Sequence, residues 1–219
     1  METVLGIKGC DFVMLGSDTI QIKSVVIVKS DHVKIYRLND FNMMALTGDT
    51  GNCMQFADYV KRHVKLYHVQ NGYAMEPLLV DKFTRSSLGD YIRTNMNFKV
   101  STLLAGYDQK TGPNLQFIDQ FGSSQSINHA GHGLGSLFCS SIFAQYWHDK
   151  LKVPEAYEIL KKCVTQMDKR FLLNVKNFDV YMVDKNGIRR LEAINSKTLK
   201  SPASLFAEKS VFPPTTARK

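Results

Sequence analysis

The chain has 219 residues, of which 44% are hydrophobic, so it can bury a sizeable core as one domain or at most two small ones. No apolar run approaches the roughly 18 residues that a membrane span needs, and we expect no membrane contact. The formal net charge is +8, with lysines and arginines scattered through every segment. Because no basic stripe, zinc-finger pattern or RNA-recognition signature accompanies them, we expect no nucleic-acid partner. Complementarity to acidic neighbouring proteins explains the charge better.

The first elements expected are β-strands. Residues 3–8 and 12–16 have the pattern of a hairpin with a short turn between them. Because the sequence begins directly with a core strand, we expect no signal peptide or leader before it. Further strands are expected over residues 25–28, 33–38 and 41–47, where alternation of apolar and polar residues is typical of half-buried strands.

A helical period replaces the strand pattern over residues 49–70. Asn71 and Gly72 end this helix, because a left-handed residue is favoured at that position. A second helix is expected to begin near Pro77, with the proline in its first turn. The first helix has apolar residues at spacings of three and four on one face, namely Cys53, Phe56, Val60, Val64 and Tyr67.

Strands return over residues 98–107 and 114–119, and two more helices follow. The second of these helices begins near residues 153–155. The first is nearly apolar all round, so we expect it to be sandwiched between two layers. Its apolar residues are Leu134, Leu137, Phe138, Cys139, Ile142, Phe143 and Tyr146.

A hairpin closes the predicted domain. Residues 178–183 and 188–194 flank the dipeptide Asn186-Gly187, which is the strongest short hairpin signal. After it the periodicity stops. We therefore expect a domain over residues 1–195 and a tail or extended arm over residues 196–219.

The order of elements indicates the fold class. Strands, two helices, strands, two helices and strands follow one another, and paired helices between antiparallel strands favour an α+β layered fold over alternating βαβ units. Two antiparallel sheets stacked face to face, with a helix pair covering each outer side, would bury the apolar residues of every element.

The four cysteines, Cys10, Cys53, Cys139 and Cys163, lie far apart in apolar stretches. We interpret them as reduced, buried side chains of a cytoplasmic or nuclear protein, in preference to disulfides. His129 and His132 suggest two metal ligands, but without nearby carboxylates a structural role is the better interpretation. The glycines that follow lack a full nucleotide-binding fingerprint. We expect no metal and no cofactor.

Residues 47–60 resemble the junction between a strand and the first helix in 20S proteasome β-type subunits, and residues 104–119 are similar to the central hairpin of that family. Residues 130–135 stand where the family has a small-residue loop before the third helix, and residues 183–188 resemble its final hairpin. The resemblance implies the four-layer αββα sandwich of N-terminal-nucleophile hydrolases.

Active members of that family are N-terminal-threonine proteases, whose threonine is released from a propeptide and acts with a lysine, an aspartate and a Ser–Asp–Ser set. Here the resemblance implies a degenerate set. We expect Asp18, one residue after the aspartate position, to point its carboxylate to the wrong face, because side chains alternate along a strand. Lys34 also falls one residue late. The positions that correspond to the family's catalytic residues are Met1, Ser17, Lys34, Leu134, Phe171 and Asn174.

The resemblance therefore implies a non-catalytic structural subunit of the 20S core particle. Its expected partners are neighbouring β subunits of the same ring, β subunits of the opposite ring and α-ring subunits, in a 28-subunit hetero-oligomer of cytoplasm and nucleus. Such a subunit completes the β ring and positions catalytic neighbours for ATP- and ubiquitin-dependent protein degradation. The alternative is a residual hydrolase that uses Thr3 after unusual processing.

Overall fold

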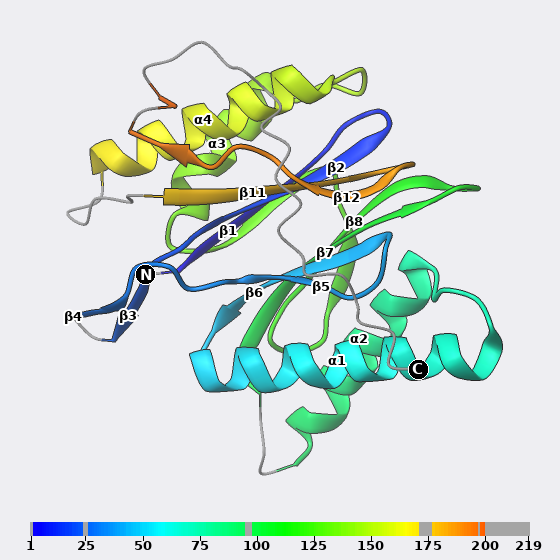
Figure 1. Cartoon of the computed structure of the whole chain (residues 1–219). Helices are drawn as coiled ribbons and strands as arrows, with labels where there is room; N and C mark the ends of the chain where they lie inside the picture. Colours follow the sequence, from blue (N-terminus) through cyan, green and yellow to red (C-terminus); the bar gives the residue numbers. More distant parts are fainter. Residues whose placement is uncertain (1, 24–25, 95–97, 171–176, 197, 200–219) are drawn as a thin grey trace, which may run out of the picture.

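Four layers make up the fold. The computed structural model describes residues 2–23, 26–94, 98–170, 177–196 and 198–199. Two antiparallel sheets are stacked face to face, helices α3 and α4 cover the outer side of one sheet, and helices α1 and α2 cover the outer side of the other (Figure 1). This arrangement confirms the predicted αββα sandwich.

The first sheet has the strand order β10-β1-β2-β11-β12, with β13 also paired to β11. Neighbouring strands are antiparallel throughout. The bounds are Thr3–Lys8 for β1, Phe12–Asp18 for β2, His129–Gly133 for β10, Asn177–Asp184 for β11, Gly187–Arg190 for β12 and Ile194–Asn195 for β13.

The second sheet has the order β5-β6-β7-β8-β9. Strands β3 and β4, which follow β2 and precede β5 along the chain, form a separate two-stranded ribbon. These strands are also antiparallel to their neighbours. The bounds are Gln21–Lys23 for β3, Val26–Lys29 for β4, Ile35–Arg37 for β5, Asn42–Gly48 for β6, Val100–Asp108 for β7, Gly112–Ile118 for β8 and Ser124–Ser126 for β9.

The helices begin and end where local sequence chemistry predicts. The Asp49 side chain caps the N-terminus of α1 by accepting a hydrogen bond from the Asn52 amide at 3.2 Å. Gly72 ends the same helix in the left-handed region, with φ of 78°. Pro77 lies in the first turn of α2. The helices are α1 Thr50–Asn71, α2 Pro77–Ile92, α3 Ser136–Tyr146 and α4 Val153–Arg170.

Three apolar clusters fill the three interfaces between the layers. Leu15, Met43 and Leu115 belong to the cluster between the sheets. The second cluster packs α3 and α4 on the first sheet, and the third packs α1 and α2 on the second sheet. Within the described ranges, no helix is both long and apolar enough to cross a membrane.

The structure corrects three predictions. Residues 129–133 form strand β10, paired with β1, where a loop was expected. Helix α3 is not sandwiched, because only one of its faces packs on the first sheet and Leu137 on another face is 69% exposed. Cys10 is exposed, whereas the other three cysteines are buried as expected. The predicted tail lies largely outside the described residues, so the domain boundary at residue 195 stays a prediction.

His132 links the two sheets through a buried polar contact. It lies on β10, its Nε2 is 3.1 Å from the carbonyl oxygen of Thr102 on β7, and its ring stacks on Phe117 of β8 with centroids 4.0 Å apart. Burial lowers the pKa of His132 from 6.5 to about 4. The imidazole is therefore neutral in the folded protein at neutral pH.

The first prediction concerns two glycines with open space around the position of an added Cβ. Gly72 has positive φ, whereas Gly89 lies inside α2 with helical backbone. Gly72→Ala should lower the free energy of unfolding by about 1 kcal/mol, because alanine is strained in the left-handed region. Gly89→Ala should raise it by about 0.5–1 kcal/mol, because alanine favours the helix. Urea unfolding of both variants measures this, and changes of equal sign would contradict it.

The second prediction concerns acid stability. Because the folded-state pKa of His132 lies below the unfolded value of 6.5, its contribution is complete above pH 6.5 and is lost as the pH falls toward 4. This loss is at most about 3 kcal/mol. His132→Gln replaces the imidazole with an amide that can still donate a hydrogen bond and does not titrate. The free energy of unfolding of this variant should therefore depend less on pH between 6.5 and 4. The control is His68→Gln at an exposed position, and a change of slope as large as that of His132→Gln would contradict the assignment to His132.

Candidate active site

A buried ion pair lies at one end of the two sheets. The ammonium Nζ of Lys34 is 3.0 and 2.9 Å from the two carboxylate oxygens of Asp18, and it also donates to the carbonyl of Ile20 at 2.8 Å. The exposed fractions of the Lys34 and Asp18 side chains are 2% and 6%. Asp18 ends β2 in the first sheet, and Lys34 immediately precedes β5 in the second. The pair therefore joins the two sheets.

Glu2 is the third charged group at this point. Its carboxylate oxygen Oε1 is 3.8 Å from Nζ of Lys34, and Oε2 accepts a hydrogen bond from the Gly48 amide at 3.4 Å. The Glu2 side chain is only 15% exposed. It contacts a buried cation on one side and the end of β6 on the other.

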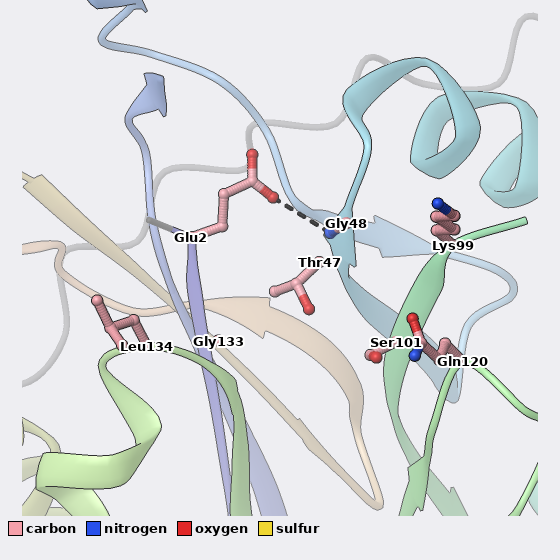
Figure 2. A pocket seen from close by; sticks show the side chains of 8 residues that line it. All are labelled: Glu2, Thr47, Gly48, Lys99, Ser101, Gln120, Gly133 and Leu134. Atoms are coloured by element: carbon pink, nitrogen blue, oxygen red, sulfur yellow. Dashed lines mark hydrogen bonds between the residues drawn. The ribbon is translucent and has the colours of Figure 1, made fainter. Parts of the chain in front are cut away.

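A cleft of about 370 Å³ opens beside Glu2. Figure 2 shows the Glu2 side chain reaching across the cleft to the amide of Gly48. The backbone is tightly packed here, because a Cβ added to Gly133, whose φ is 88°, would lie 1.7 Å from the carbonyl oxygen of Glu2. The lining residues are Glu2, Thr47, Gly48, Lys99, Ser101, Gln120, Gly133 and Leu134.

Thr3, the next residue along the chain, does not line this cleft. Its side chain is buried, and its hydroxyl oxygen accepts a hydrogen bond from the Gly135 amide at 3.1 Å. Its own backbone N–H donates to Asp18 Oδ1 at 2.7 Å. Because successive side chains of a strand point to opposite faces, Glu2 is directed into the cleft and Thr3 away from it.

The structure brings together only part of the predicted site. Lys34 lies beside the cleft, but Asp18 rather than Ser17 contacts it. The expectation that the Asp18 carboxylate points to the wrong face is therefore wrong. The expectation failed because Asp18 and Lys34 are both displaced by one residue from the family pattern. The two side chains therefore remain partners. Leu134 lies at the cleft and is 44% exposed.

The same displacement by one residue identifies a residue that the sequence reasoning missed. Met1 was expected at the position of the nucleophile, and it lies outside the described residues. In the structure Glu2 stands beside Lys34. The equal shifts of Asp18 and Lys34 were visible in the sequence and could have indicated Glu2. Phe171 and Asn174 also lie outside the described residues, so their roles stay predictions.

The chemistry available at the cleft is limited. An ionised glutamate only accepts hydrogen bonds and carries no hydroxyl for attack on a carbonyl. Thr47 and Ser101 supply hydroxyls, but neither is hydrogen-bonded to a basic side chain within the described ranges, as an activated nucleophile requires. His129 packs against Phe143 and Trp147, and His132 bonds to backbone. Among the described residues, no group of three metal-ligating side chains occurs.

Comparison with known proteins gives a consistent result. Residues 1–183 match the family described as Proteasome subunit. The probable proteasome subunit beta type-4 of Schizosaccharomyces pombe is 32% identical over 192 residues, which cover 87% of this chain and 99% of the relative.

Two further relatives extend the comparison to plants and to a second yeast. The proteasome subunit beta type-2 of Oryza sativa subsp. japonica is 31% identical over 86% of this chain and 89% of its own length. The proteasome subunit beta type-4 of Saccharomyces cerevisiae is 30% identical over 88% of this chain and 98% of its own length.

The ion pair generates the third prediction. Asp18→Asn and Lys34→Met should each lower the free energy of unfolding by about 3–5 kcal/mol, because each leaves a buried charge unpaired. The double variant should lose less than the sum of the single variants, since no uncompensated charge remains within the pair. Urea unfolding of the four proteins forms a double-mutant cycle. Additive losses would show that the two side chains are not energetically coupled.

Proposed function

This chain belongs to the proteasome β-subunit family and is a subunit of the 20S core particle, and from that premise we propose that it is a non-catalytic subunit. One observation carries the proposal. Among the residues that line the cleft, Glu2 places its carboxylate beside the Lys34 ammonium, and the nearby Thr3 hydroxyl points away and bonds to Gly135. In a comparable serine hydrolase, loss of the nucleophile alone lowers turnover by about 10⁶.

The surface of the chain supports a structural role within an assembly. Large apolar side chains are exposed on separate elements, including Val26 on β4, Val69 on α1, Phe121 after β8 and Leu137 on α3, at 62%, 70%, 63% and 69%. Exposed apolar surface of this kind is typical of protein–protein contact sites. It supports neighbours on several sides, and a ring of nonidentical subunits needs interfaces that reject wrong neighbours.

We propose specific partners on this basis. The chain takes the ring position of its beta type-4 and beta type-2 relatives, between two β subunits of its own ring, and it contacts β subunits of the opposite ring and α subunits. In that position it completes the β ring of a 28-subunit particle, holds catalytic neighbours in register for ATP- and ubiquitin-dependent degradation, and works in cytoplasm and nucleus.

Two contacts of Thr3 argue against the alternative of a hydrolase that uses this residue. The Thr3 backbone nitrogen donates to Asp18 at 2.7 Å, and the Thr3 hydroxyl accepts from the Gly135 amide on the side away from the cleft. Its side chain would have to leave a buried position and cross the strand to approach Lys34.

The fourth prediction distinguishes the non-catalytic role from a hydrolase that uses Thr3 with one pair of variants. Thr3→Ala should lower the yield of assembled particles, because it removes a buried hydrogen bond worth about 1 kcal/mol, whereas Thr3→Ser keeps the hydroxyl. The rate of peptide hydrolysis for each particle should be the same for wild type and both variants. The measurement is turnover of several peptide substrates by purified particles of known concentration.

A selective loss of one peptidase activity in Thr3→Ala particles, restored in Thr3→Ser particles, would contradict the non-catalytic assignment. Native mass analysis of the same preparations checks the partners. It should find this chain in a particle with α subunits and the other β subunits, and a stable free chain would contradict the structural role.

A further inference from the structure

The carboxylate of Glu2 lies at the wall of the cleft and faces two groups that can attract an anion. Glu2 Oε2 accepts from the Gly48 amide at 3.4 Å, and Oε1 lies 3.8 Å from the Lys34 ammonium. A backbone N–H and an ammonium together are typical partners of an anionic oxygen. The carboxylate of Glu2 therefore has the contacts that a bound ligand would make.

Glu2 neutralises the net charge of the charged groups around it. Lys34 and Lys99 contribute two positive charges, and Asp18 contributes one negative charge. Without Glu2 these groups carry a net charge of +1, and with Glu2 they are neutral. Lys99 is exposed and lines the cleft, so it adds attraction for an anion that enters from solvent.

We propose that the cleft is a carboxylate-binding site whose resident ligand is the chain's own Glu2, and that the ligand class it excludes is the C-terminal carboxylate of a peptide. The inference does not depend on whether the subunit is catalytic, because it concerns binding alone. Hydrolysis of a peptide bond creates a new carboxylate, so a proteolytic particle produces this class of ligand at each cleavage.

The covalent link makes Glu2 a strong competitor. A tethered group that reaches its site acts at an effective concentration of about the millimolar range or higher. A free peptide terminus that makes the same contacts must overcome this competition in addition to its own loss of translational freedom. The resident carboxylate thus keeps the cleft from retaining cleavage products.

The test uses purified particles that contain this chain, and N-acetylglycine as a small mimic of a peptide C-terminus. Glu2→Ala vacates the site, and because Glu2 precedes β1 its truncation removes no core side chain. Ligand-observed NMR titration should show that Glu2→Ala binds N-acetylglycine at least tenfold tighter than the wild type. N-acetylglycinamide, which has the same shape without the charge, should not show this gain.

Matched variants locate the binding. Glu76→Ala removes an exposed carboxylate at the start of α2, outside the cleft, and should bind like the wild type. Glu2→Ala with Lys99→Ala should bind N-acetylglycine several-fold more weakly than Glu2→Ala alone. Glu2→Gln fills the same space and should stay within about threefold of the wild type.

Two results would overturn the proposal. One is an affinity of Glu2→Ala for N-acetylglycine that equals the wild-type affinity. The other is an equal gain for the neutral amide, which would mean that the gain does not come from recognition of a carboxylate.

Discussion

The buried ion pair between Lys34 and Asp18 holds the two sheets together at the end where the cleft opens. Asp18 is in the last residue pair between β2 and β11 of the first sheet. The carbonyl oxygen of Lys34 accepts a hydrogen bond from the Leu46 amide of the second sheet at 3.0 Å. Removing two charges from water is expensive, and only close geometry with further hydrogen bonds offsets this cost. Both conditions hold, since Asp18 also accepts the Thr3 amide and Lys34 also donates to Ile20. The start of β1, and with it Glu2, is positioned by this pair.

The ion pair and the Glu2 carboxylate beside it fit the proposed non-catalytic role. Lys34 and Asp18 stabilise the fold whether or not the subunit turns over a substrate, because each makes a hydrogen bond with a backbone group where the two sheets meet. Glu2 adds a second negative charge, and its carboxylate accepts a hydrogen bond from the Gly48 amide. The Gly48 amide and the Lys34 ammonium are thereby both in contact with a carboxylate of the chain itself. In the proposed role the subunit acts through its outer surface, which exposes apolar side chains such as Leu137 and Val69.

Local sequence chemistry predicted much of this fold, and long-range contacts explain the errors. Gly72, Pro77 and the turn at Asn186 act through the backbone of a few neighbouring residues, so their consequences were visible in the sequence. Helix α3 was misjudged because an all-apolar helix indicates burial without showing what covers each face, and among the described residues Leu137 on its outer face is exposed. Strand β10 was missed because His129–Gly133 is rich in glycine and lacks alternation, and only its pairing with β1 makes it a strand. In the site, the equal shifts of Asp18 and Lys34 were visible in the sequence, but the contact between the two side chains became visible only in the structure.

Covalent labelling of the assembled particle tests the non-catalytic assignment most directly. Particles are treated to completion with an inhibitor that forms a bond with N-terminal threonines, and the intact mass of this chain is then measured beside those of the other β subunits. We expect catalytic neighbours to gain the mass of the inhibitor while this chain stays unmodified, with a mass that still includes Glu2. A chain that begins at Thr3 and carries the inhibitor would contradict both the non-catalytic role and the position assigned to Glu2 in the cleft.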